Sequence, residues 1–149
     1  MSRFDMLPSA VAPVIDHSSF GPLRASGRLP DGGWRWEALD LIDTPHGQVD
    51  LSFDAGLGGP GRAHEAQLAL LLAQLDTLTN AAAPSIKSAL AHCVDLPLSN
   101  PWAELKWHGA HVTGEDGMFQ LHYDCKSWPD AMVTVQFERS KPVLVRIED

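Results

Sequence analysis

The 149-residue sequence has few of the features that mark disulfide-stabilised or nucleic-acid-binding proteins. It has only two cysteines, Cys93 and Cys125, which lie in different predicted elements and form no C-x-x-C pair. We therefore predict two buried thiols, with neither a disulfide nor a metal site. Its 11 lysines and arginines are outnumbered by 19 aspartates and glutamates. The resulting formal charge of −8 disfavours binding to nucleic acid, which normally needs a basic surface.

Long apolar runs are also absent. No stretch of the sequence approaches the roughly 18 apolar residues that a membrane-spanning helix needs. Acidic residues and prolines interrupt residues 1–20, so this segment does not have the apolar centre of a secretory signal peptide. We therefore expect a protein that works in the cytoplasm, with neither a membrane nor a nucleic acid among its partners.

The residues that are present favour one folded domain. The sequence is 44% hydrophobic and 20% charged, which is ordinary for a globular protein and argues against disorder. A chain of this length buries roughly 68–70% of its unfolded surface, so it can fold without a metal or a disulfide. We predict a loosely ordered N-terminal arm over residues 1–17, followed by a single α+β domain over residues 18–149.

The densest apolar pattern lies between residues 60 and 95 and predicts two helices. Leucines recur at helical spacing and predict one stripe along a first, continuous helix, namely Leu68, Leu71, Leu72, Leu75 and Leu78. Pro84 suits the first position of a second helix, where its missing N–H is not needed. The apolar face of that second helix would comprise Ile86, Ala89, Leu90, Cys93 and Val94.

Strands are predicted on both sides of these helices. Val49, Leu51 and Phe53 alternate with polar residues, which is typical of a half-buried strand with an acidic outer face. After the helices, alternation over residues 104–113, 119–125, 133–137 and 143–147 predicts a four-strand antiparallel meander. The predicted fold class is therefore α+β, with a mainly antiparallel sheet of about six to seven strands and two helices packed on one face.

A glycine-rich loop precedes the first predicted helix. Gly56, Gly58 and Gly61 match the spacing of the dinucleotide-binding pattern G-x-G-x-x-G. That pattern belongs to repeated βαβ units with a parallel sheet, whereas the later strands are predicted to be antiparallel. We therefore interpret the loop as a flexible connection between a strand and a helix.

Histidines raise the question of a metal or an acid–base site. If the strand register pairs His111 with His122, Asp124 could complete a site of two histidines and one carboxylate. His108 and His111 are three residues apart on a predicted strand, so we expect them on opposite faces. The sequence has no Gly-x-Ser-x-Gly motif, and no histidine is placed to activate either cysteine. We expect no catalytic residue, metal or cofactor, and keep a small metal- or ligand-dependent enzyme using the two histidines and Asp124 as the alternative.

Acidic residues are numerous on the predicted strands and turns. They include Asp40, Asp43, Asp50, Asp54, Glu115, Asp116, Asp124 and Asp130. Charges on outer strand faces commonly serve solubility alone. They can also attract a basic partner and raise its association rate. Trp128, in a predicted turn, would then be an exposed anchor for that partner, unless it packs over its own sheet.

The order of the predicted elements resembles a known class of proteins. N-terminal hairpins, a Leu/Ala-rich helix after a glycine–proline loop, and a meander carrying Tyr123, Asp124, Cys125 and Trp128 resemble small bacterial immunity proteins. These are encoded beside secreted polymorphic or type VI toxins. The resemblance covers roughly residues 20–147 in outline. In those proteins the cysteine and tryptophan precede an acidic residue and a Glu-His-Gly segment, whereas here Ala131 follows Asp130.

This resemblance implies a function without catalysis. A protein of this class binds a cognate toxin and neutralises it. The candidate partner-binding residues are Asp50, Asp54, Asp124, Trp128 and Asp130. A secretion chaperone or adaptor, which would bind the export region of an effector instead of its toxic domain, is a further alternative.

Overall fold

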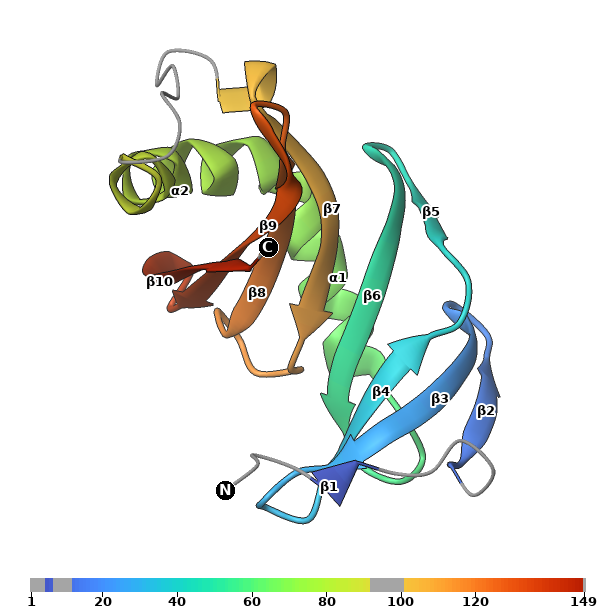
Figure 1. Ribbon diagram of the computed structural model, residues 1–149. Coiled ribbons are helices and arrows are strands. Elements are labelled where there is room, and N and C mark those ends of the chain that lie inside the picture. The colour runs from blue at the N-terminus through green and yellow to red at the C-terminus, as the bar shows by residue number, and fades with distance from the viewer. Residues whose placement is uncertain (1–4, 7–11, 92–100, 149) are drawn as a thin grey trace.

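The computed structural model describes residues 5–6, 12–91 and 101–148 (Figure 1). Cys93 and Val94, which were predicted on the second helix, lie outside these residues. So do residues 1–4 and 7–11 of the predicted N-terminal arm. Cys125 is a buried free thiol, as predicted.

The described residues form an α+β fold with a mainly antiparallel sheet, which confirms the predicted class. The predicted number of strands was too low, because the sheet contains ten strand segments within the described residues. They are β1 (Asp5–Met6), β2 (Val14–His17), β3 (Gly21–Arg28), β4 (Trp34–Ala38), β5 (Ile42–Thr44), β6 (Gly47–Ala55), β7 (Leu105–Val112), β8 (Phe119–Cys125), β9 (Trp128–Glu138) and β10 (Lys141–Glu148). Short segments such as β1, β2 and β5 contain too few residues for alternation to reveal them.

The strands follow the order β1-β3-β4-β6-β7-β8-β9-β10, while β2 pairs with β3 and β5 pairs with β6. Every pair is antiparallel except β6 with β7, which run parallel. Both helices lie in the connection between these two strands. A connection of that length is what returns the chain to the same end of a sheet for parallel pairing. The last four strands form the predicted antiparallel meander.

Both helices lie on one face of the sheet, as predicted, with α1 spanning Arg62–Ala73 and α2 spanning Leu75–Ala89 (Figure 1). The sheet residues facing them are the apolar half of each alternating strand, including Leu51, Phe53, Leu121 and Val135. A hydrogen bond of 2.8 Å between Thr79 Oγ1 and Tyr123 Oη crosses this core. Burial raises the pKa of Tyr123 far above its ordinary value, so the phenol stays neutral.

The helix boundaries differ from the prediction. The first helix ends at Ala73, and Gln74 separates it from α2, with its N–H donating to the carbonyls of Leu70 and Leu71. Pro84 lies inside α2 instead of starting a helix. An internal proline costs about 3 kcal/mol. Burying Ile86 and Leu90, both 0% exposed, contributes about 1.5–3 kcal/mol each, which offsets that cost. Among the described residues, no helix is long and apolar enough to cross a membrane.

Candidate functional site

The face of the sheet that points away from the helices carries polar side chains. On β6, Leu51 and Phe53 point into the core, so Ser52 and Asp54 point to the other side. The strand register places Ser52 beside His111, His111 beside Gln120, and Gln120 beside Gln136. We call this surface the polar face, and it consists of Asp50, Ser52, Asp54, His108, His111, Gln120, His122, Asp124, Thr134 and Gln136.

A β-bulge in β7 brings two histidines to the polar face. The pairing of β7 with β8 shifts between Trp107 and Gly109, so His108 is an extra residue in its strand. An extra residue reverses the alternation beyond it. The prediction that His108 and His111 lie on opposite faces was therefore wrong. His108 Nδ1 lies 3.7 Å from a carboxylate oxygen of Asp124, at the edge of the polar face.

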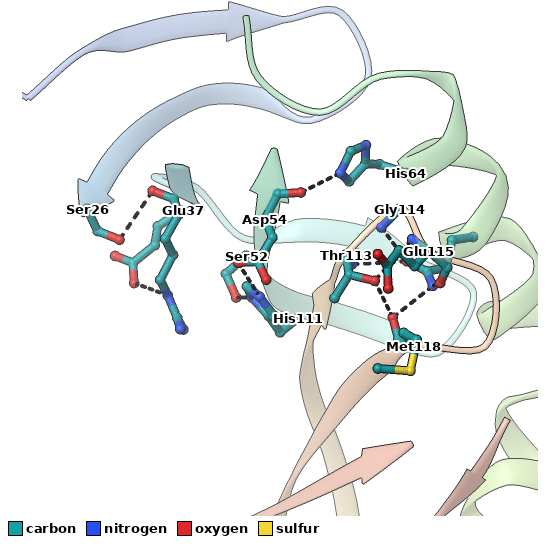
Figure 2. Close-up of polar contacts among 12 residues, drawn as sticks. Ser26, Glu37, Ser52, Asp54, His64, His111, Thr113, Gly114, Glu115 and Met118 are labelled. Atoms are coloured by element: carbon teal, nitrogen blue, oxygen red, sulfur yellow. Dashed lines mark hydrogen bonds and ion pairs between the residues drawn. The ribbon is translucent and has the colours of Figure 1, made fainter. Parts of the chain in front are cut away.

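His111 lies at the centre of the polar face, between two side chains of β6. Its Nδ1 is 2.7 Å from Ser52 Oγ, and its Nε2 is 2.8 Å from Asp54 Oδ1. Figure 2 shows the side chains of Ser52, Asp54 and His111 close together. The histidine is only 5% exposed. With Asp54 ionised, Nε2–H donates to the carboxylate, which leaves Nδ1 to accept a hydrogen bond from the Ser52 hydroxyl. This chain of three side chains fixes both the orientation and the tautomer of the imidazole.

A cavity of about 610 Å³ opens beside this chain. Its walls include Arg35, Asp54, His111, Gln120 and Gln136. The turn before β4 and the loop between β7 and β8 complete the rim, through residues such as Asp31 and Glu115. Cavities of about 300–1,000 Å³ with a few convergent polar groups are typical of binding sites. The charges around this one are of both signs.

A buried glutamine of α1 holds the loop that forms the rim. Gln67 Oε1 accepts hydrogen bonds from the N–H groups of Thr113 and Gly114, at 3.1 and 2.9 Å. Its Nε2 donates to the carbonyls of Glu115 and Met118. All four hydrogen-bonding positions of the amide are used, so the loop is tied to the helix layer. No pattern in the sequence indicates this role, since Gln67 resembles any polar residue of an amphipathic helix.

A second tether comes from His64 at the start of α1. Its Nε2 lies 2.6 Å from the backbone carbonyl of Asp54, and its Nδ1 lies 3.1 Å from the N–H of Gly61. Nε2 therefore donates and Nδ1 accepts. The end of β6, where Asp54 reaches the cavity, is thus held by the helix that follows it.

His122 lies in a locally positive environment on the polar face. Its Nδ1 is 2.9 Å from the hydroxyl of Thr134, which is buried. Burial is the main cause that lowers the pKa of His122 from 6.5 to about 4, and the neighbouring His108, His111, Arg35 and Arg146 contribute to the same shift. At neutral pH its imidazole is uncharged. The polar face is consequently a surface of mixed charge and not a uniformly acidic one.

The structure brings together three of the five predicted partner-binding residues. Asp50 and Asp54 point to the same side of β6 as Ser52, and Asp124 lies across the sheet beside His108. Trp128 starts β9 and packs, half-buried, against the core, so it is not the exposed anchor that its predicted turn suggested. Asp130 is exposed at an irregular stretch of the same strand.

The alternative metal site depended on a register that does not form. His122 pairs with Gly109, whereas His111 pairs with Gln120. Both ring nitrogens of His111 are already hydrogen-bonded to Ser52 and Asp54. Within residues 5–6, 12–91 and 101–148, no group of three or more His, Cys, Asp or Glu side chains is arranged to hold a metal ion.

Comparison with known proteins adds no further assignment. No protein-family model, curated protein or solved structure matches the chain. The function must therefore be inferred from the site itself. Of its central residues, the sequence predicted Asp54 and His111 but missed Ser52, whose pairing with His111 spans 59 residues.

Proposed function

We propose that the protein is an immunity protein that binds and neutralises a cognate secreted bacterial toxin without catalysing a reaction. The observation that supports this most is the division of the sheet into two faces. The helices occupy one face, while the other is polar and contains a cavity of about 610 Å³. A polar concave surface of this kind suits a protruding side chain of a protein partner.

The charges of the chain favour a basic partner. The formal charge of −8 attracts such a partner over distance, which raises the association rate. Asp50, Asp54 and Asp124 offer carboxylates on the polar face, and Arg35 beside them favours a partner with a matching pattern of both signs. Charge complementarity of this kind determines which partner binds and in which orientation.

The polar face is also held rigid before any partner arrives. His111 is fixed by Ser52 and Asp54, and the rim loop is fixed by Gln67. Groups that are already ordered lose little conformational entropy when they bind. The same property fits an inhibitor that must hold its toxin tightly.

The test is co-expression with the toxin encoded beside the gene, followed by affinity measurement. We expect rescue of growth and a complex that buries roughly 800 Å² on each partner. The double substitution Asp50→Lys/Asp124→Lys should weaken binding at least about tenfold, because it reverses two charges on the docking face. Asp76→Lys, on α2 in the helix layer, is the matched control and should bind nearly normally.

Two results would contradict this proposal. The first is a neighbouring toxin that the protein neither binds nor neutralises. The second is a complex in which the polar-face variant and the control bind equally well. Binding only to the export region of the toxin would instead support the chaperone or adaptor alternative.

A second candidate function is acyl transfer at Ser52. The hydrogen-bonded series Ser52–His111–Asp54 is the arrangement that activates a serine nucleophile, since His111 Nδ1 can take the hydroxyl proton. However, β6 pairs with β4 on one side and β7 on the other, so ladder bonds engage the backbone N–H groups near Ser52. In acyl transfer, backbone N–H groups near the serine normally stabilise the oxyanion. Here the sheet already uses these N–H groups, which disfavours acyl transfer at Ser52.

Labelling with a fluorophosphonate probe separates the two candidates. The binding proposal predicts no covalent adduct on Ser52. An adduct that disappears in both Ser52→Ala and His111→Asn would establish a reactive serine and overturn the non-catalytic proposal. The Ser26→Ala variant is the matched control, because Ser26 donates only to a backbone carbonyl.

A further inference from the structure

The cavity of about 610 Å³ on the polar face has an uneven distribution of charge around its lining. Three carboxylates line it, those of Asp31, Asp54 and Glu115, whereas Arg35 is the one arginine or lysine among the described lining residues. Arg35 Nε lies 3.7 Å from a carboxylate oxygen of Glu37, which is not part of the lining. The described lining is therefore net negative, whether or not His111 is protonated, and it favours a group that carries positive charge.

Asp54 is the carboxylate best placed to bind such a group. Its Oδ1 is 2.8 Å from Nε2 of the buried His111, so the side chain is held in one orientation. No hydrogen bond or ion pair engages its Oδ2 within the described residues. The buried side-chain polar atoms that lack a partner there are Arg24 Nε and Trp107 Nε1. Oδ2 of Asp54 is therefore open to solvent, in a side chain that is 33% exposed and lines the cavity.

The rest of the lining supplies hydrogen-bond acceptors and apolar surface. The register places Gln120 beside His111 and Gln136 beside Gln120, so two half-buried amides follow His111 in one row across the sheet. Gln136 Nε2 donates to Glu138 Oε1 at 3.4 Å, which leaves its carbonyl oxygen as an acceptor. A long side chain with an apolar stem and a charged, planar end matches this combination. The apolar residues of the lining include Leu29, Pro30 and Met118.

We propose that the cavity receives an arginine side chain of the toxin, whose guanidinium pairs with Oδ2 of Asp54. This inference rests on the proposed function, and it names the group of the partner that enters the polar face. A guanidinium has five N–H donors in one plane, so it can pair with a carboxylate and also donate to an amide oxygen such as that of Gln136. A lysine ammonium lacks this planar fork. The arginine stem lies against the apolar part of the lining, where its methylene groups are removed from water.

The first test uses a small probe and needs no toxin. N-acetylarginine N-methylamide is titrated into the protein, and the backbone amide signals are followed by nitrogen–proton NMR. The signals of Asp54, Ala55 and Gln120 should shift saturably, with a dissociation constant on the order of 1 mM for so small a probe. The citrulline analogue has the same length without the charge and should cause no saturable shift. The lysine analogue should bind at least about threefold more weakly.

Asp54→Asn removes the charge while keeping an oxygen that can accept a hydrogen bond from His111 Nε2–H. It should weaken binding of the arginine probe about fivefold or more. Asp76→Asn, on α2 in the helix layer, is the matched control and should bind the probe like the wild type. Equal binding of the arginine and citrulline probes to the wild type would overturn the proposal, and that comparison needs no variant. Unchanged affinity in Asp54→Asn, or equal affinity for the lysine probe, would also overturn it.

A second test follows the same pairing in the toxin complex. Replacing each interface arginine of the toxin by glutamine should identify one whose loss weakens binding at least about tenfold. In Asp54→Asn this loss should shrink to about twofold or less, because the charge that the arginine pairs with is already absent. A complex in which no toxin arginine is coupled to Asp54 would overturn this proposal and leave the immunity function standing. Probe binding without any toxin complex would instead refute the immunity function, while the guanidinium site would stand.

Discussion

Replacing His122 by asparagine should reduce by about 2 kcal/mol the loss of stability that we expect in mild acid. Asparagine keeps a polar atom near the position of Nδ1, so the hydrogen bond to Thr134 can be retained. It has no group that titrates in this range. The substitution therefore isolates the imidazole, whose pKa is lowered to about 4 in the folded protein by burial and by neighbouring positive charge.

The sign and the size of the effect follow from the two pKa values. Below pH 6.5 the unfolded chain takes up a proton at His122, whereas the folded protein does so only near pH 4. The free energy of unfolding therefore falls as the pH drops from 6.5 to 4 and levels off below that range. The difference of 6.5 − 4 pH units corresponds to roughly 3 kcal/mol at most. Since the ring keeps some contact with solvent, we expect about 2 kcal/mol.

The assay is urea unfolding of the wild type and of His122→Asn at pH 7.5 and at pH 4.5. Other titrating groups are common to both proteins, so their contributions cancel in the comparison. The wild type should lose about 2 kcal/mol more than the variant between these two conditions. Gln120→Asn, on the same strand and face, is the matched control and should follow the wild type. Equal losses in the wild type and His122→Asn, or an NMR titration of His122 near pH 6.5, would refute the reasoning.

Two further predictions concern the packing that holds the polar face. Gly109→Ala should lower the free energy of unfolding by about 3 kcal/mol in urea titration, because the new Cβ would lie 2.4 Å from the carbonyl oxygen of Asp50. Gly58→Ala is the matched control. Its Cβ would meet open space, so the free energy of unfolding should change by less than about 0.5 kcal/mol. A small effect of the first substitution would contradict the close pairing of β6 with β7. Gln67→Ala should speed hydrogen exchange of the amides of residues 113–118 and lower the free energy of unfolding by about 1–2 kcal/mol, since it leaves partly buried backbone groups unpaired. Gln74→Ala, with no capping hydrogen bond from its side chain, is the control, and similar exchange in both variants would argue against the tether.

The central residues of the site were only partly predictable. Alternation placed Asp54 on an outer strand face, and the histidines of the later strands were recognised as candidates. The pairing of His111 with Ser52 and Asp54 was not predictable, because it requires the parallel register of β6 and β7. That register is set after two intervening helices, so no neighbouring residues in the sequence encode it.

Predictions made from the local sequence, namely strand alternation and helix boundaries, were also wrong at particular residues, for physical reasons. The bulge at His108 depends on how β7 fits β8, and it reverses the direction of every side chain after it. The helix boundary at Gln74 and the continuation of α2 through Pro84 depend on which leucines and alanines find space against the sheet. In each case the packing of distant segments outweighs the preference of the local sequence.

The sequence by itself determined the fold class, the helix layer and the apolar face of the meander. The periods of strands and helices relate residues that are close in the sequence. The pattern of apolar residues therefore predicts the burial of Leu121, Val135 and Leu71 without knowledge of the tertiary structure. Only the tertiary structure decided that Ser52, Asp54 and His111 meet beside a cavity. This site arises from contacts between segments far apart in the chain, whose geometry is fixed by the strand register and by the way the helices cross the sheet.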